Sequence, residues 1–262
     1  MSSLATYQAD FSLAGRCALI TGSSAGLGLE IARAYAAHGA RIILNGRDAQ
    51  KLQLLAESLR SQGAQVDLWP QDLGDLPALD ASYDALCKRV GTPDILVNNV
   101  GIRLRSRLQD AAWDQIEQLL HVDLLATLKL SKLAAQAMLA AQTQAGRIIT
   151  LTSIAGPLAR PGDAIYPVAK QGLSGLVRSL AVEFGGQGIT SNGIAPGTFA
   201  TESNAALAQD PVKGPLVVGR NPLARWARPD EIRAAAVFLA SPAASYVNGH
   251  IVVVDGGFSI TF

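Results

Sequence analysis

The sequence reads CALITGSSAGLG at residues 17–28, and this stretch decides the fold class. Its apolar start, residues 17–21, predicts a buried β-strand, and residues 26–38 predict an amphipathic helix. The glycines between them let the backbone approach a phosphate without a Cβ in the way, and the helix N-terminus adds free N–H groups. The spacing G-x-x-x-G-x-G is neither the commoner G-x-G-x-x-G nor a P-loop. A strand–loop–helix unit of this kind favours dinucleotide binding over its alternative, a ligand-free glycine turn.

Short apolar runs alternate with longer amphipathic runs along the rest of the chain. Strands are expected at residues 17–21, 41–45, 65–69, 94–98, 147–152, 189–194 and 251–254, the sixth being the weakest. Helices are expected at residues 26–38, 48–61, 75–90, 110–142 and 166–184. This alternation predicts one α/β domain, residues 1–262, with a parallel sheet covered on both faces. Residues 198–226 are longer than an ordinary connection, so we expect a small lid insertion there.

The composition narrows the classes of function. Hydrophobic residues make up 49% of the chain and charged residues 16%, which argues against disorder. The 22 basic residues nearly balance the 21 acidic ones, so nothing favours nucleic acid or acidic membranes as partners. No apolar run approaches the roughly 20 residues of a membrane span, and residues 1–15 lack the pattern of a signal peptide. With two cysteines and three scattered histidines, we expect a soluble cytoplasmic protein without a metal site.

The end of the second expected strand bears on which dinucleotide binds. An acidic residue there would hydrogen-bond a ribose 2′-hydroxyl and repel a 2′-phosphate. The sequence has Asn45, Gly46 and Arg47 instead, and an arginine can clamp a phosphate bidentately. We therefore expect NADP(H) to be preferred, with NAD(H) left open. The alternative is that Arg47 is an ordinary surface arginine beside a helix.

Three side chains point to chemistry at the end of the fifth expected strand. Ser153 follows that strand, Tyr166 comes thirteen residues later, and Lys170 lies one helical turn beyond Tyr166. An ammonium group beside a phenol favours the phenolate, so Tyr166 could exchange a proton with an alcohol or ketone. Ser153 could donate a hydrogen bond to the same oxygen. Singly, these residues could be a solvated helix face and a strand-end cap, and their combination with the glycine loop is what favours catalysis.

The chain resembles the short-chain dehydrogenase/reductase family over essentially its whole length. The matching motifs are residues 21–28, NNVG at 98–101, Ser153 with YPVAK at 166–170, and PGT at 196–198. The resemblance implies a Rossmann-type, doubly wound parallel sheet of seven strands, hydride transfer with NAD(P), and a homotetramer or homodimer. Together with Arg47, the implied cofactor contacts are Gly22, Ser24, Gly26, Leu27, Gly28, Asp72, Leu73, Asn99, Gly101, Tyr166, Lys170, Pro196, Gly197 and Thr198.

One position departs from the family pattern. Family members carry an asparagine in the long helix that completes a tetrad with the serine, tyrosine and lysine, and this chain reads VDL at residues 122–124. Ionised Asp123 can accept hydrogen bonds but cannot donate one, and a carboxylate near Lys170 would keep the lysine protonated. We expect activity to survive with an altered pH profile. Asp123 therefore joins Ser153, Tyr166 and Lys170 as an expected catalytic residue.

Within the family, the chain is similar to gluconate 5-dehydrogenases, which interconvert gluconate and 5-ketogluconate. The likeness includes LNGR at residues 44–47 and FATE at residues 199–202. Arg105 and Arg160 are placed to bind the carboxylate of an anionic substrate, although either could be a surface or interface charge. Arg103 and Arg107 follow the fourth expected strand as Arg105 does, and Arg220 and Arg225 lie at the end of the expected lid insertion. The alternatives are a 3-oxoacyl thioester (acyl carrier protein) reductase, another ketone reductase, and a cofactor-binding redox sensor without turnover.

Overall fold

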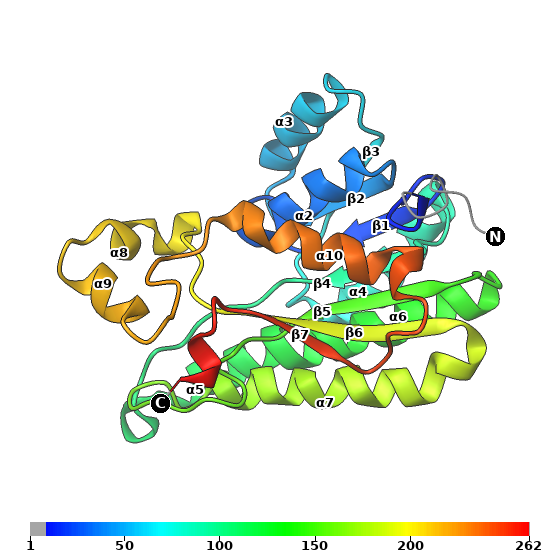
Figure 1. The fold of residues 1–262 in the computed structure, drawn as a ribbon. Coiled ribbons are helices and arrows are strands. Elements are labelled where there is room, and N and C mark those ends of the chain that lie inside the picture. The colour runs from blue at the N-terminus through cyan, green and yellow to red at the C-terminus, as the bar shows by residue number, and fades with distance from the viewer. Residues whose placement is uncertain (1–8, 262) are drawn as a thin grey trace.

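The computed structural model describes residues 9–261, and a seven-stranded parallel sheet lies at its centre (Figure 1). The strands are β1 (Cys17–Ile20), β2 (Arg41–Gly46), β3 (Val66–Pro70), β4 (Ile95–Asn98), β5 (Gly146–Leu151), β6 (Ile189–Pro196) and β7 (Ile251–Val254). Their order in space is β3-β2-β1-β4-β5-β6-β7. The chain order reverses beside β1, and ligands of such sheets bind at the carboxyl ends of the strands at this point. The predicted doubly wound sheet is confirmed.

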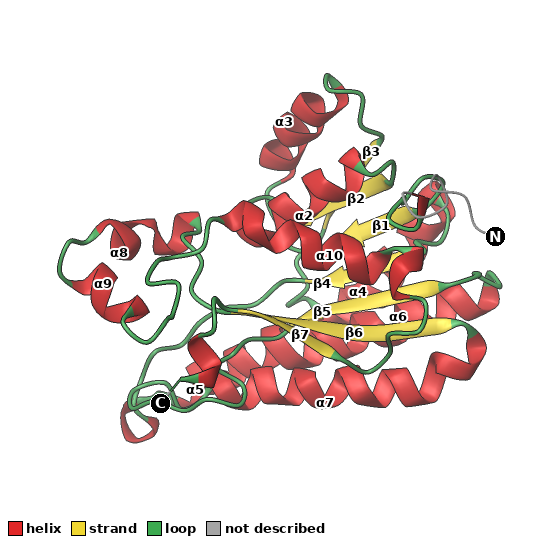
Figure 2. Cartoon of the chain, viewed as in Figure 1, coloured by secondary structure: helices red, strands yellow, loops and turns green. Residues whose placement is uncertain are grey.

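The strands are apolar on both faces because helices cover both faces. In β1, Ala18 and Ile20 face one core, whereas Cys17 and Leu19 face the other. The first core lies under α2 (Gly26–Ala37), α3 (Ala49–Arg60) and α10 (Arg233–Ala240), and the second under α4 (Leu76–Val90), α6 (Ala126–Ala140) and α7 (Tyr166–Phe184). Figure 2 shows the helices on either side of the strands. Side chains for chemistry therefore remain accessible only at the strand ends.

The helix expected at residues 110–142 starts later and is interrupted. A 3₁₀ turn at Leu108–Asp110 comes first, α5 covers Trp113–Leu120, a π-helical turn covers His121–Leu125, and α6 ends at Ala140. A π turn inserts an extra residue into the helical repeat and so redirects the side chains around it. The prediction of one regular helix was wrong here because the apolar pattern continues across the turn. The π turn carries Asp123, which is fully buried.

The sixth strand, β6, was expected to be weak but is the longest of the seven, with eight residues. Its polar side chains are paired inside the protein. Asn192 donates to the Val247 carbonyl at 2.8 Å and accepts from the His250 N–H at 3.0 Å. Residues that look unfavourable for a buried strand are therefore satisfied by the segment leading into β7.

Residues 198–226 connect the end of β6 to the segment before α10. They contain two short helices, α8 (Ala205–Gln209) and α9 (Lys213–Val218), which project beyond the sheet edge at which β6 ends (Figure 1). The isolated bridge between Phe199 and Ala227 brings the two ends of the insertion together. Residues 198–226, named the lid segment after the role expected for them, are therefore a side excursion from the end of β6 rather than a change in the sheet.

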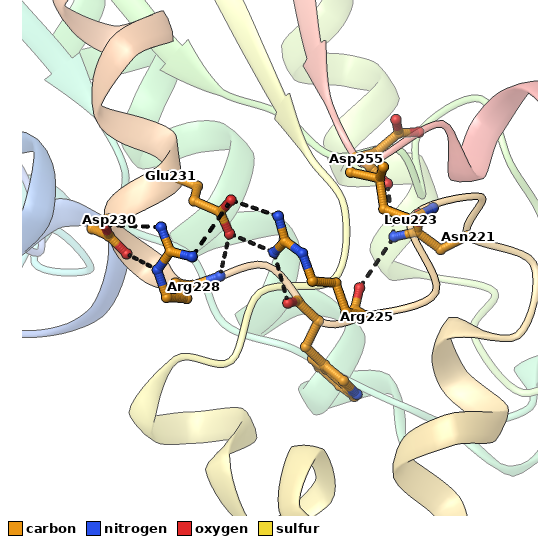
Figure 3. A network of polar contacts seen from close by, with 8 residues as sticks. Asn221, Leu223, Arg225, Arg228, Asp230, Glu231 and Asp255 are labelled. Carbon is orange, nitrogen blue, oxygen red and sulfur yellow. Dashed lines mark hydrogen bonds and ion pairs between the residues drawn. The ribbon is translucent and has the colours of Figure 1, made fainter.

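A polar network anchors the base of the lid, as Figure 3 shows. Arg225 binds Glu231 with both terminal nitrogens at 2.7 Å, and Glu231 also accepts from the Arg228 N–H at 2.8 Å. These contacts lower the pKa of Glu231 to about 2, with the Arg225 side chain as the largest cause. Asn221 donates to the carbonyls of Arg225 (3.3 Å) and Asp255 (3.2 Å), which ties the lid to the end of β7.

Among residues 9–261, no helix is long and apolar enough to cross a membrane. The same residues contain no cluster of three histidine, cysteine, aspartate or glutamate side chains suited to a metal ion. Residues 1–8, which belong to the segment considered above for a signal peptide, lie outside the described part of the chain.

Candidate active site

Two asparagine side chains hold the glycine loop between β1 and α2. Asn45, buried at the end of β2, accepts from the Gly22 N–H at 3.2 Å and donates to the Trp69 carbonyl at 3.0 Å. Asn99, just beyond β4, donates to the carbonyls of Thr21 (2.9 Å) and Gly22 (3.2 Å). Each contact connects the loop to a neighbouring strand end. The loop is therefore held at the carboxyl edge of the sheet.

The shape of the loop fits a pyrophosphate group. Gly22 and Gly26 have φ angles of 60° and 56°, which favour glycine. A Cβ on Gly28 would lie only 2.5 Å from the Asn99 amide nitrogen, so the close approach of α2 requires glycine. A carboxylate oxygen of Glu202, from the lid, accepts a hydrogen bond at 3.0 Å from the Gly26 N–H at the start of α2. An anionic group already occupies this helix N-terminus, which supports its suitability for a phosphate.

A cavity of about 530 Å³ adjoins the glycine loop. The expected cofactor contacts among its lining residues are Gly22, Ser24, Arg47, Asp72, Leu73, Asn99 and Gly101. Arg47 is exposed and forms no ion pair among residues 9–261, so its guanidinium is available to a phosphate. A larger cavity, of about 820 Å³, lies beside Arg33 and Arg233 and contains none of the expected site residues. The 530 Å³ cavity beside the glycine loop is therefore the candidate site for a dinucleotide.

The backbone after β6 supplies further expected cofactor contacts. A Cβ on Gly197 would lie 2.7 Å from the Cα of Asp255, so only glycine permits the close packing of these two segments. The Gly197 N–H donates to the Val254 carbonyl at 2.9 Å. The Thr198 hydroxyl is buried and has no partner among residues 9–261. Pro196, Gly197 and Thr198 do not line the 530 Å³ cavity, and Thr198 lines a separate cavity of about 200 Å³ together with Asn221 and Asp255.

Helix α7 begins at Tyr166 and places Lys170 one turn later, beside the end of β5. Lys170 Nζ lies 5.4 Å from the centroid of the Tyr166 ring and 3.5 Å from the Leu151 carbonyl oxygen. Ser153, two residues beyond β5, accepts a hydrogen bond from the Ala155 N–H at 3.0 Å. The Ser153 hydroxyl donates to no group among residues 9–261, so it can donate to a substrate oxygen. All three side chains lie at the same edge of the sheet as the glycine loop.

The π turn brings Asp123 into contact with Lys170. Asp123 Oδ2 lies 3.2 Å from Lys170 Nζ, an ion pair without hydrogen-bond geometry, and Oδ1 accepts from the Ile102 N–H at 2.6 Å. Burial raises the pKa of Asp123, and the Lys170 charge and the Ile102 N–H oppose this rise. A Cβ on Gly101 would lie 2.9 Å from Asp123 Oδ2 and 3.0 Å from Lys170 Nζ, so glycine leaves room for the pair.

Three arginines gather near Tyr166 around one buried carboxylate. Asp163 Oδ2 lies 3.2 Å from Arg103 Nη2 and 3.1 Å from Arg160 Nη2. The guanidinium carbon of Arg103 lies 4.8 Å from the centroid of the Tyr166 ring. Desolvation lowers the pKa of Arg105, and repulsion from Arg103 and Arg160 lowers it further. Arg105 forms no ion pair among residues 9–261, which makes it the arginine of this group with its charge available.

Two of the arginines considered for an anionic substrate are engaged elsewhere. Arg225 is bound to Glu231 at the base of the lid. Arg220 donates to the Thr261 carbonyl, and its guanidinium carbon lies 5.3 Å from the centroid of the Phe258 ring. Both guanidinium groups are therefore held in contacts within the chain.

Sequence reasoning missed the roles of Asn45, Glu202 and Asp163. In the sequence, Asn45 drew attention only because it stands where an acidic residue would bind a ribose hydroxyl. A polar residue at the end of an apolar strand could also have predicted its hydrogen bonds to the glycine loop and to β3. Glu202 reaches Gly26 across 176 residues of sequence, and Asp163 reaches Arg103 across 60. Contacts of this kind depend on the completed fold and leave no local pattern.

Comparisons with known proteins agree with this geometry. Residues 22–259 match the protein-family model described as enoyl-(acyl carrier protein) reductase. The chain is 35% identical over 251 residues to gluconate 5-dehydrogenase of Gluconobacter oxydans, covering 96% of this chain and 97% of that protein. It is 39% identical over 259 residues to galactitol 2-dehydrogenase (L-tagatose-forming) of Cereibacter sphaeroides, covering 97% and 99%. It also matches the crystal structure of a gluconate 5-dehydrogenase from Burkholderia cenocepacia in complex with NADP and tartrate, with a TM-score of 0.93, 38% identity and coverage of 98% and 100%.

Proposed function

Because the chain belongs to the short-chain dehydrogenase/reductase family, we propose that it interconverts a secondary alcohol and a ketone on a sugar acid, such as gluconate and 5-ketogluconate. The observation that carries this proposal is the arrangement at the carboxyl edge of the sheet. Tyr166 lies there close to both Lys170 and Arg103, beside further arginines suited to a carboxylate. The glycine loop and its cavity lie at the same edge and fit NADP(H).

In the proposed mechanism, bound NADPH supplies the hydride for ketone reduction, and NADP⁺ accepts it in alcohol oxidation. Tyr166 donates its phenolic proton to the substrate oxygen during reduction and takes a proton back during oxidation. The Ser153 hydroxyl donates a hydrogen bond to the same oxygen and stabilises its negative charge. Lys170 would bind the ribose hydroxyls of the cofactor, and its ammonium group lies beside the Tyr166 ring.

The proposed preference is for NADP(H) over NAD(H). Arg47 lines the cavity at the end of β2, where it can bind a 2′-phosphate. Asp48, the first acid after β2, accepts a hydrogen bond from the Lys51 N–H at 2.9 Å and so caps the start of α3. Its carboxylate is thereby engaged at a helix start rather than presented to a ribose. The relative from Burkholderia cenocepacia was crystallised with NADP, which supports the same preference.

The proposed substrate is an anion, and Arg105 is the residue proposed to bind its carboxylate. Arg103 and Arg160 share Asp163, whereas Arg105 has no acidic partner among residues 9–261. The Burkholderia relative holds tartrate, a hydroxy acid with two carboxylates. An uncharged polyol is the second candidate, because the name of the Cereibacter relative gives galactitol as its substrate. A polyol would leave the positive charge of the arginine cluster without a partner.

The enzyme is further proposed to act as a single-domain, cytoplasmic homo-oligomer, with residues 198–226 as a lid over the site. The outer side of α7 exposes Val168 and Val182, and the C-terminal part exposes Val253 and Ile260. A second copy of the chain would cover these exposed apolar side chains.

Replacing Tyr166 by phenylalanine tests the proposed chemistry. Tyr166→Phe keeps the ring but removes the proton donor, so turnover should fall by at least about 100-fold. Binding of NADPH, followed by cofactor fluorescence, should remain. Tyr246→Phe is the matched control, because Tyr246 is fully exposed and should keep the wild-type rate. Full turnover by Tyr166→Phe would overturn the proposed mechanism.

A further inference from the structure

The cation one turn along α7 from Tyr166 is closely neutralised. Lys170 Nζ lies 5.4 Å from the centroid of the Tyr166 ring. It is also 3.2 Å from the carboxylate of Asp123, and both side chains of this pair are almost closed to solvent. A buried pair with one charge of each sign has a weak net field at the neighbouring ring.

A second cation lies closer to the ring and is less completely neutralised. The Arg103 guanidinium carbon is 4.8 Å from the Tyr166 centroid. Arg103 and Arg160 both bind the same oxygen of Asp163, at 3.2 and 3.1 Å. Two guanidinium groups against one carboxylate leave one positive charge uncompensated. The side of Tyr166 that faces Arg103 therefore carries the excess positive charge.

We propose that Arg103 is a positioning residue that acts through Tyr166. Asp163 holds the Arg103 guanidinium over the phenol ring. Because Asp123 neutralises the charge of Lys170, Arg103 supplies the net positive charge beside Tyr166. This charge stabilises the phenolate formed when Tyr166 gives up its proton. This deepens the proposed function and rests on it for the role of Tyr166 as the proton donor.

The position of Arg103 is fixed by a buried partner. The Asp163 side chain is only 1% exposed, whereas that of Arg103 is 39% exposed. Asp163 lies three residues before Tyr166, so the acid stands in the loop that leads into α7 and the phenol stands at the first residue of the helix. A buried carboxylate does not move freely, and it holds the guanidinium against the ring in a way that a lone surface arginine would not be held.

The expected size of the effect follows from the exposure of Arg103. A cation over an aromatic ring at an exposed site gives a modest stabilisation, and a full negative charge on the phenolate adds to it. The charged groups around Tyr166 are Arg103, Lys170 and Asp163, with Asp123 acting through Lys170 and with Arg105 and Arg160 lying around Asp163. Removing one of these charges should move the ionisation midpoint of Tyr166 by about half a pH unit.

An alkaline titration of the full-length protein tests the proposal without substrate or turnover. Phenolate absorbance is recorded against pH. Each variant is made both with Tyr166 and with Tyr166→Phe, and the curve of the protein that lacks Tyr166 is subtracted from the curve of the protein that has it. Burial raises the pKa of Tyr35 and Tyr83 well above the usual range, so these two tyrosines stay protonated. The difference curve then reports Tyr166.

We expect Arg103→Gln to raise the Tyr166 midpoint by about half a unit and Asp123→Asn to lower it by about as much. The double variant should titrate near the wild type, and Arg103→Lys, which keeps the charge, should stay close to it. Arg178→Gln removes an exposed arginine further along α7 and is the control for net charge. Circular dichroism checks that each variant is folded.

An Arg103→Gln curve identical to that of Arg178→Gln would overturn the proposal, as would an Asp123→Asn curve identical to the wild type.

Kinetics separate this role from direct substrate binding. If Arg103 acts through Tyr166, Arg103→Gln moves the rising limb of kcat/KM for alcohol oxidation to higher pH. A raised KM with an unmoved limb would instead make it a substrate ligand. Because the titration needs no substrate, its outcome is independent of whether a sugar acid is turned over.

Discussion

Asp123 places a carboxylate in a position closed to solvent, and its protonation is therefore linked to folding. Burial raises its pKa above the ordinary value of 3.8. The folded chain then binds this proton at a higher pH than the unfolded chain does. The contribution to stability is fully present below the unfolded value and is lost as the pH rises through the raised pKa. An ionised Asp123 thus costs stability that a neutral residue at this position would not.

Asp123→Asn tests this linkage, because asparagine mimics the neutral form in shape. We expect the Tm of the wild type, relative to that of Asp123→Asn, to fall by a few °C as the pH is raised from about 4 to about 7. Thermal unfolding followed by fluorescence at a series of pH values measures the difference. Asp114→Asn, at an exposed aspartate, should show no such trend. A Tm difference that stays constant with pH would contradict the assignment.

Among single residues, the sequence predicted those contacts whose partners are close along the chain. Tyr166 and Lys170 are one helical turn apart, so their proximity follows from helix geometry alone. The pairing of Arg103 with Asp163 joins two loops that are 60 residues apart. Neither loop has a periodic pattern, so only the folded sheet, which brings the ends of β4 and β5 together, reveals this contact.

Among the elements, the lid and α2 share a contact that has consequences for cofactor binding. Glu202, at the start of the lid, accepts a hydrogen bond from the Gly26 N–H. A pyrophosphate favours the same helix N-terminus, and two anionic groups compete for it. NADP(H) must therefore displace Glu202 when it binds, and this displacement lowers its affinity.

Glu202→Gln should lower the Kd for NADP⁺ by about two- to fivefold, because the neutral side chain competes less well for the helix N-terminus. Isothermal titration calorimetry measures the change. Glu183→Gln, at an exposed position on α7, serves as the control and should bind like the wild type. Weaker binding by Glu202→Gln would mean that Glu202 supports the bound state and would refute the competition.

The elements also show where sequence patterns succeed and fail. α7 and β7 occupy the residues predicted for them, because each has a clear apolar pattern with sharp limits. The interruption of the long helix at His121–Leu125 was not predictable from apolar periodicity, since a π turn keeps the same residue types. β6 was underestimated because Asn192 looks unfavourable in a strand until its partners are known.

Over the whole molecule, the parallel sheet explains why distant motifs form one site. The glycine loop follows β1, Asn99 follows β4, Ser153 follows β5 and Gly197 follows β6. Because parallel strands end at one edge, these motifs must meet there. The near-neutral net charge of +1 conceals a local excess of positive charge at that edge. There Arg103 and Arg160 share one acid, Asp163, and Arg105 forms no ion pair with any of residues 9–261. Only the assembled fold makes this asymmetry visible.

A substrate panel with NADP⁺ and NAD⁺ tests the proposed oxidation of a sugar acid. The panel contains gluconate, galactitol, other polyols, hydroxy acids and a 3-hydroxyacyl thioester, and kcat/KM is measured for the wild type and for Arg105→Leu. We expect the highest kcat/KM for gluconate or another sugar acid with NADP⁺. We also expect Arg105→Leu to lower this value by about 10- to 100-fold for acids alone. A preference for polyols or the thioester that Arg105→Leu leaves unchanged would contradict it.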